Sequence, residues 1–169
     1  MGDATVDKDF LQLIQQNSGI IYKVCRVYCA AENDREDLAQ EIIYQLWKSA
    51  KSYDAAFKFT TWMYRVALNT AISFNRASRR TANTISIDDN NIDVEDKADH
   101  VHATDENIRL LQQYISELKD LDKALMILYL EAKSYSDIAY ITGLTETNVA
   151  TKISRIKEKL KQRFLTIHT

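Results

Sequence analysis

Two cysteines and three histidines are the residues of this chain that could bind a metal or form a nucleophile–base pair. Cys25 and Cys29 are four residues apart, the spacing that puts two side chains on one face of a helix. A zinc site needs further nitrogen or sulfur ligands, and the histidines lie far along the chain, at His100, His102 and His168. We interpret the cysteines as small hydrophobic core residues and predict no metal, no cofactor and no catalytic residue.

Two carboxylates on one helix could bind a metal or a cation, and the segment at residues 34–47, DREDLAQEIIYQLW, offers such a pair. Wound as a helix, it buries a face made of Leu38, Ala39, Ile42, Ile43 and Leu46. The opposite face collects Asp37, Gln40, Glu41 and Tyr44, with Trp47 at its border. A di-metal site would need Glu-x-x-His pairs, and residues 1–99 contain no histidine. Repulsion between the two carboxylates favours a cationic partner, and a solvated acidic surface remains the alternative.

A nucleic-acid surface is indicated further along, where a helix is predicted from Thr60 to about Arg80. Its predicted core face consists of Met63, Val66, Ala67, Thr70, Ala71, Phe74 and Ala77. The other face mixes a large aromatic with cations and polar groups: Trp62, Arg65, Asn69, Ile72, Ser73, Arg76 and Arg80. Exposed apolar surface beside positive charge is unusual for solubility alone, and binding of single-stranded or distorted nucleic acid would explain it.

The segment before this helix is predicted to be a loop in which aromatic residues alternate with lysines. Tyr53, Phe57 and Phe59 lie around Lys51 and Lys58. Such aromatics suit stacking on unpaired bases, or they anchor the loop to the core. Both interpretations remain open on the residues alone.

The segment at residues 134–163 has the spacing of a helix-turn-helix, with Gly143 where a tight turn needs a positive φ and Thr145 as a hydroxyl N-cap. A single buried stripe is predicted from Val149, Ile153, Ile156 and Leu160. Short polar side chains for base edges, with Arg155 and Glu158, lie opposite: Thr147, Thr151 and Ser154. The run from 152 to 163 has six cations against one carboxylate, a net +5, from Lys152, Arg155, Lys157, Lys159, Lys161 and Arg163 against Glu158. The alternative is an ordinary amphipathic helix with a solvated basic face.

The whole composition favours an all-α chain, since there is no proline and only three glycines in 169 residues. The glycines are too scattered for a phosphate-binding loop. Residues 81–106 carry one basic and eight acidic side chains, a net −7, and few large apolar groups, so we predict a flexible acidic linker there. It would join two small helical domains at residues 1–80 and 107–169. We see no signal peptide and no apolar run near the roughly 20 residues of a membrane span, and expect a cytoplasmic protein without membrane insertion.

Three motifs, in order, resemble those of the extracytoplasmic-function (ECF) group of bacterial RNA polymerase sigma factors. DREDLAQEIIYQLW (34–47) resembles the group's D-x-E-D-L-x-Q-E signature, and FTTWMYRVALNTAI (59–72) its F-x-T-W-L-x-R-I-A-x-N segment. SYSDIAYITGLTETNVATKISRIKEKL, which begins at Ser134, resembles its promoter-reading fourth region. The resemblance implies an all-α fold, with a sigma-2-like domain of three or four helices, an acidic linker and a sigma-4-like helix-turn-helix domain.

The resemblance also implies three sets of binding residues. Those for the β′ coiled coil of core polymerase are Asp37, Gln40, Glu41, Tyr44 and Trp47. Those for the minus-10 element, where Asn69 and its neighbours would capture an unpaired base, are Lys58, Trp62, Arg65, Asn69, Ile72, Ser73, Arg76 and Arg80. Those for the minus-35 element are Thr147, Asn148, Thr151, Lys152, Ser154, Arg155 and Lys159.

The function implied is promoter recognition and strand opening by a dissociable polymerase subunit that is not itself an enzyme. Its implied partners are core polymerase, through the β′ coiled coil and the β flap, promoter DNA, and an anti-sigma factor. The linker would lie along the basic channel of the polymerase, with a passive tether as the alternative. Two departures are Ser73, where many relatives carry Asp, and Leu121-Asp122 in place of Leu-Pro, where we expect a longer or differently capped helix. The alternative function is a helix-turn-helix regulator that binds operators without joining polymerase and has no need of residues 34–47.

Overall fold

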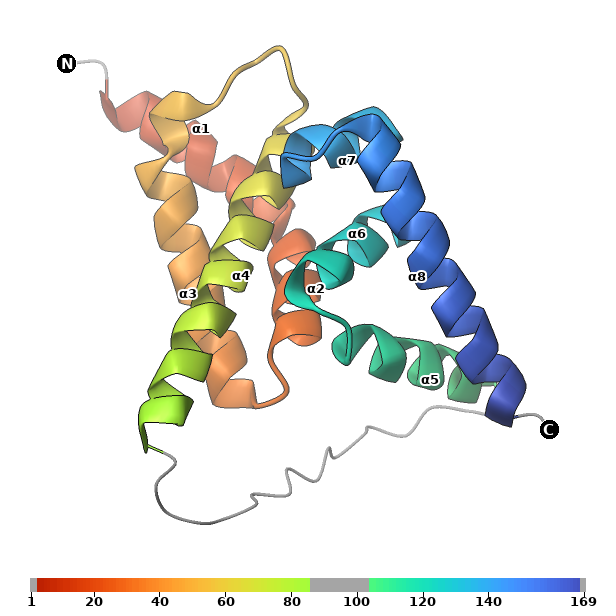
Figure 1. The fold of residues 1–169 in the computed structure, drawn as a ribbon. Helices are drawn as coiled ribbons and strands as arrows, with labels where there is room; N and C mark the ends of the chain where they lie inside the picture. Colours follow the sequence, from red (N-terminus) through yellow and green to blue (C-terminus); the bar gives the residue numbers. More distant parts are fainter. Residues whose placement is uncertain (1–2, 86–103, 168–169) are drawn as a thin grey trace. The chain divides into compact units, whose positions relative to one another are not determined.

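The described part of the chain is helical, as predicted. The computed structural model describes residues 3–85 and 104–167, and within these ranges every regular element is a helix (Figure 1). The chain divides into two compact units, Met1–Val94 and Glu95–Thr169. Among the described helices, none is long and apolar enough to cross a membrane.

Within residues 3–85, the first unit contains four α-helices and one short 3-10 turn: α1 (Asp3–Gln16), α2 (Ser18–Tyr28), α3 (Glu32–Lys48), η1 (Ala50–Ser52) and α4 (Phe59–Ile85). Helices α2, α3 and α4 pack against one another, and α1 packs on α2. Fully buried side chains from these three helices form the core: Val24, Leu38, Ile42, Leu46, Met63, Ala67 and Ala71.

The first two helices are separated at Asn17. The backbone N–H of Asn17 donates to the carbonyls of Leu13 and Ile14, each at 3.2 Å, while its side-chain amide donates to the Leu13 carbonyl at 2.8 Å. Helix α2 ends at Tyr28, because the backbone of Cys29 is extended. Helix α3 begins at Glu32 without a side-chain cap, because its N-cap residue is Ala31, whose side chain has no acceptor.

An aromatic cluster fixes the connection between α3 and α4. Trp62 lies with its ring centroid 5.8 Å from Phe10, 5.3 Å from Tyr53 and 5.7 Å from Phe59. The Tyr53 hydroxyl also donates to the Phe57 carbonyl at 3.0 Å. The loop aromatics therefore anchor the loop to the core, which was one of the two interpretations of their spacing.

The second unit consists of α5 (Thr104–Ser116), α6 (Asp120–Leu130), α7 (Tyr135–Thr142) and α8 (Glu146–Ile167). Helices α6, α7 and α8 pack against one another, and α5 packs on α6, as expected for the support of a helix-turn-helix. The core includes Leu125, Leu128, Ile138, Ile141, Val149, Ile153, Ile156 and Leu160. Lys119, which has no acceptor oxygen, precedes α6 as its N-cap residue, so this helix lacks side-chain capping at the departure Leu121-Asp122.

The predicted turn chemistry of the helix-turn-helix is confirmed. Gly143 ends α7 with φ +75°, and its N–H donates to the Ala139 carbonyl at 2.9 Å. Thr145 then accepts from the backbone N–H of Asn148 at 3.2 Å, the N-cap bond expected for α8. A residue in the left-handed conformation also follows α6, but at that position it is Ala132, at φ +54°, and not a glycine.

The predicted linker is shorter than expected, because α4 continues to Ile85 and α5 begins at Thr104. Residues 81–85 and 104–106 are therefore helical. The rest of the acidic stretch, residues 86–103, lies outside the described residues, as do the predictions made for it.

We predict opposite effects of exchanging alanine and glycine at the two left-handed positions. Gly143→Ala should lower the free energy of unfolding of the second unit by about 1 kcal/mol, since an L side chain disfavours this conformation. A Cβ at Gly143 would meet nothing within 4 Å, so the loss is conformational. Ala132→Gly should raise it by up to about 1 kcal/mol by relieving the same penalty. Urea unfolding followed by far-UV circular dichroism checks both, and a shift of the same sign in the two variants would contradict the account.

Candidate binding faces

The outward face of α3 combines acidic, amide and aromatic side chains, as predicted. Leu38, Ile42 and Leu46 are fully buried against α2 and α4. On the other side, Asp37 and Gln40 are exposed, Tyr44 and Trp47 are 55% and 42% exposed, and Glu41 is half-buried. Glu41 is the most inward of the set, and its carboxylate accepts from the Gln45 amide at 2.9 Å.

Ile43 was predicted to be buried and is 42% exposed. At about 100° per residue it lies about 40° from Trp47 around the helix, well outside the narrow stripe of Leu38, Ile42 and Leu46. The face therefore presents three large apolar side chains beside Asp37 and Gln40. This mixture suits a partner helix that offers apolar contacts and a cation.

The outward face of α4 carries most of the predicted cations and polar groups. Arg65, Asn69, Ser73, Arg76 and Arg80 are exposed, Ile72 is half-buried, and Lys58 is exposed just before the helix. These side chains lie at spacings of three and four residues along one side of the helix. They form a ridge of positive charge interrupted by amide and hydroxyl groups.

Trp62 was predicted on this face, and that prediction is wrong. It shares the angular position of Asn69 and Arg80 on the helical wheel, but its side chain is only 4% exposed. Phe10 from α1 and Tyr53 from the preceding loop cover it.

The inner face of α4 also differs from the prediction. Thr61, Tyr64 and Leu68 are buried although they were not expected to be, and Ala77 is exposed. The core face is thus rotated toward Leu68, and the helix beyond Phe74 extends past the core.

Helix α8 presents the predicted recognition face. Val149, Ile153, Ile156 and Leu160 are all buried, which confirms the predicted stripe. The side chains predicted to meet DNA lie away from it: Thr147, Asn148, Thr151, Ser154, Arg155 and Lys159 are exposed, and Lys152 is half-buried. The first turns of α8 therefore offer short hydrogen-bonding groups next to an arginine.

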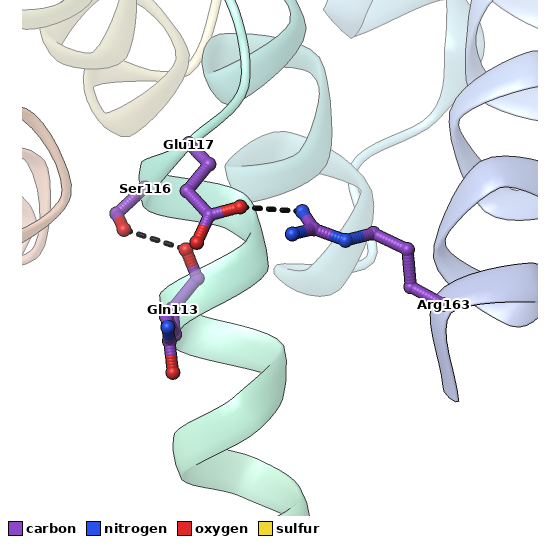
Figure 2. A network of polar contacts seen from close by, with 4 residues as sticks. All are labelled: Gln113, Ser116, Glu117 and Arg163. Carbon is purple, nitrogen blue, oxygen red and sulfur yellow. Dashed lines mark hydrogen bonds and ion pairs between the residues drawn. The ribbon is translucent and has the colours of Figure 1, made fainter. Parts of the chain in front are cut away.

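Two of the six predicted phosphate-binding cations are held within the second unit. Lys157 donates to the Tyr129 hydroxyl at 3.1 Å and lies 4.9 Å from the centroid of its ring, and the hydrogen bond raises the pKa of Lys157. Arg163 forms an ion pair with Glu117 (Figure 2). Lys157 keeps its charge beside the neutral hydroxyl, whereas Glu117 offsets the charge of Arg163, so the net charge available to a phosphate backbone is smaller than the +5 of residues 152–163.

The cysteines behave as core residues. Cys25 and Cys29 are 2% and 5% exposed, and the Cys29 carbonyl accepts from Arg35 Nε at 2.8 Å. Burial raises the pKa of the Cys25 thiol to about 11, so it is protonated at neutral pH and poorly suited to bind a metal or attack a substrate. Within the described ranges, no group of three or more His, Cys, Asp or Glu side chains could hold a metal ion, while the three histidines fall outside those ranges.

Comparison with known proteins gives matches for both units. Residues 13–81 match the family model of sigma-70 region 2, and residues 108–160 match that of sigma-70 region 4. An ECF RNA polymerase sigma-E factor of Haemophilus influenzae is 31% identical over 143 residues, which are 79% of this chain and 76% of the relative. The ECF RNA polymerase sigma factor SigW of Bacillus subtilis is 27% identical over 93% of this chain and 90% of its own.

Two solved structures share the fold at low sequence identity. The sigma factor RpoE of Bartonella quintana, solved with the anti-sigma factor NepR, gives a TM-score of 0.69 at 17% identity, over 92% of this chain and 96% of that one. CnrH, solved with the cytosolic domain of CnrY, gives 0.66 at 17% identity, over 95% and 90%.

The two tryptophans should respond differently to truncation. Trp62→Ala removes a buried ring and should lower the free energy of unfolding of the first unit by about 3–5 kcal/mol. Trp47→Ala removes a ring that is 42% exposed and should change it by no more than about 0.5 kcal/mol. Chemical unfolding of the two variants measures the difference, and equal losses would place Trp62 on the surface after all.

Proposed function

The chain belongs to the ECF RNA polymerase sigma factors, and from this membership we propose how its two units divide the work of promoter recognition. The first unit binds core polymerase and the minus-10 element, and the second binds the minus-35 element. The observation that carries the proposal is the exposed face of α3, where Ile43, Tyr44 and Trp47 lie beside Asp37. A protein that only read operator DNA would have no use for it.

The α3 face is proposed to bind the coiled coil of the polymerase β′ subunit. Asp37 and Glu41 would pair with cations of that coiled coil, while Gln40, Tyr44 and Trp47 pack against it. Ile43 is added to these proposed contact residues because its side chain is exposed. Apolar contact supplies most of the affinity of such an interface, and the carboxylates set its register.

The α4 ridge is proposed to bind the minus-10 element as it opens. Lys58, Arg65, Arg76 and Arg80 would contact phosphates, while Asn69 hydrogen-bonds an unpaired base, with Ile72 and Ser73 beside it. Trp62 does not contact DNA in this proposal, because the aromatic cluster buries it. It contributes only by stabilising the fold. The cluster supports the first turn of α4 and with it the position of Lys58.

The first turns of α8 are proposed to enter the major groove of the minus-35 element. Thr147, Asn148, Thr151 and Ser154 suit base edges or nearby phosphates, and Arg155 suits guanine or a phosphate. Lys152 and Lys159 flank this face and would contact the backbone.

Further partners and the location follow from the same assignment. The second unit would also contact the β flap of polymerase, and the chain would bind an anti-sigma factor, as RpoE of Bartonella quintana does in its complex with NepR. We propose a cytoplasmic location, where polymerase acts, and assign the chain no catalytic step, since polymerase carries out RNA synthesis.

Charge reversal on α3 tests the polymerase interface. Asp37→Lys/Glu41→Lys should abolish binding to core polymerase and leave the fold intact, since losing one partner of a desolvated charge pair typically costs about 2–5 kcal/mol. Asp37→Lys alone should weaken binding more than Asp9→Lys, a matched reversal at an exposed position of α1. Affinity is measured by titration of labelled core polymerase. Unchanged affinity of the double variant would contradict the proposal that the α3 face binds core polymerase.

Substitutions on the two proposed DNA-binding faces should impair different steps of promoter recognition. Asn69→Ala should impair opening of the minus-10 region and preserve binding to duplex minus-35 DNA. Arg155→Ala should weaken upstream binding by about 1–3 kcal/mol if it contacts a base, or lower the salt slope by about one if it contacts a phosphate. Permanganate footprinting of the holoenzyme and filter binding across salt concentrations separate the two, and each variant serves as the control for the other. Normal strand opening with Asn69→Ala would contradict the minus-10 role.

A further inference from the structure

The C-terminal part of α8 is tied to the end of α5 by contacts that the proposed function does not use. The guanidinium of Arg163 lies 2.5 Å from the carboxylate of Glu117, the residue that follows the last turn of α5 (Figure 2). Both side chains are partly solvated, at 47% and 42% exposure. The pair therefore joins the two helices at the surface of the second unit.

An aromatic pair supports the same contact from beneath. The guanidinium carbon of Arg163 lies 4.2 Å from the centroid of the Tyr114 ring, and Tyr114 is 5% exposed. The next residue of α8, Phe164, packs edge-on against Tyr114 with centroids 5.3 Å apart. A planar guanidinium that stacks on a ring and pairs with a carboxylate is fixed in both distance and orientation.

The position of Arg163 on α8 shows which motion this contact controls. Arg163 follows Ile156 by seven residues, so it lies within about 20° of the buried stripe, where the next apolar side chain is expected. Thr147 and Thr151 lie on the far side of the helix. A contact at Arg163 therefore acts on the rotation of α8 about its axis and does not touch the recognition face.

Ion pairs as exposed as this one contribute little to folding. Apolar packing is non-directional and tolerates small rotations, whereas a charge-assisted hydrogen bond with defined geometry does not. Beyond Leu160 the buried stripe ends, and Lys161 and Gln162 are exposed. The orientation of this part of α8 depends on the contact with α5.

We propose that Arg163, held by Glu117 and Tyr114, is a positioning residue that sets the rotation of α8 and so aligns its face with the minus-35 bases. The proposal rests on the role proposed above for α8. Its consequence is that sequence discrimination at the minus-35 element depends on the carboxylate of Glu117, just after α5 and distant from the recognition face.

Glu117→Gln is the variant that tests it, because it removes the partner of Arg163 and leaves every cation and all of α8 intact. Holoenzyme reconstituted with the full chain is titrated with a promoter mapped from transcripts that depend on this protein. The same promoter with its minus-35 block replaced gives the ratio of affinities. We expect this ratio to fall about tenfold, the size of a lost base contact, with an unchanged salt slope and an unchanged urea midpoint.

Two controls accompany it. Glu117→Asp keeps the carboxylate and should keep most of the discrimination. Lys161→Ala removes an exposed cation near Arg163 and should weaken binding to both promoters, with the salt slope lower by about one and the ratio preserved.

An unchanged ratio with Glu117→Gln overturns the proposal. So does stronger binding to both promoters, which would make Arg163 a phosphate contact that Glu117 restrains, and so does a ratio that falls only together with the urea midpoint. Arg155→Ala in the same assay distinguishes a failure of the positioning role of Arg163 from a failure of the minus-35 role of α8. If Arg155→Ala lowers the ratio and Glu117→Gln does not, only the positioning role fails; if replacing the minus-35 block has no effect on binding, the assignment of α8 fails as well.

Discussion

Burial of an apolar face on α3, α4 and α8 is the constraint on which the proposed binding surfaces depend, and on α3 and α8 this face is a narrow stripe. In α3 the stripe is Leu38, Ile42 and Leu46, and in α8 it is Val149, Ile153, Ile156 and Leu160. A narrow stripe leaves more than half of each helix outside the core. The surfaces proposed for polymerase and for promoter DNA are what remains on α3, α4 and α8 once these stripes are buried.

Local regularities made much of this predictable from the sequence. The helix-turn-helix follows from a glycine at a position with positive φ, a threonine cap and apolar residues at spacings of four, three and four, and each of these acts within a few residues of itself. The burial of α8 could therefore be derived without knowledge of the fold. The exposed positions of Asp37, Gln40 and Tyr44 follow in the same way from their place opposite the α3 stripe.

The errors arise where a side chain's environment is supplied by distant parts of the chain. Trp62 has the helical phase of an exposed residue, but Phe10 and Tyr53 cover it, and nothing in its own helix indicates this. Ile43 is the reverse case, because no neighbouring helix reaches far enough around α3 to cover it. Lys157 and Arg163 looked like part of a uniform basic surface, while their partners lie elsewhere, Tyr129 in α6 and Glu117 in the turn after α5. The Leu38–Leu46 spacing could have excluded Ile43, but no local signal could have identified the cover of Trp62.

The placement of the two tryptophans has an optical consequence. Both lie in the first unit, so tryptophan fluorescence reports on that unit alone. The helix-turn-helix contains no tryptophan and does not emit when tryptophan is excited selectively. Trp62, surrounded by three aromatic rings, should emit at shorter wavelength than Trp47, whose ring is 42% exposed to water. Binding of a partner to the α3 face would shift the emission of Trp47 to shorter wavelength and leave the emission of Trp62 unchanged. The protein thus carries an intrinsic label on the surface proposed for polymerase and an internal reference in its core.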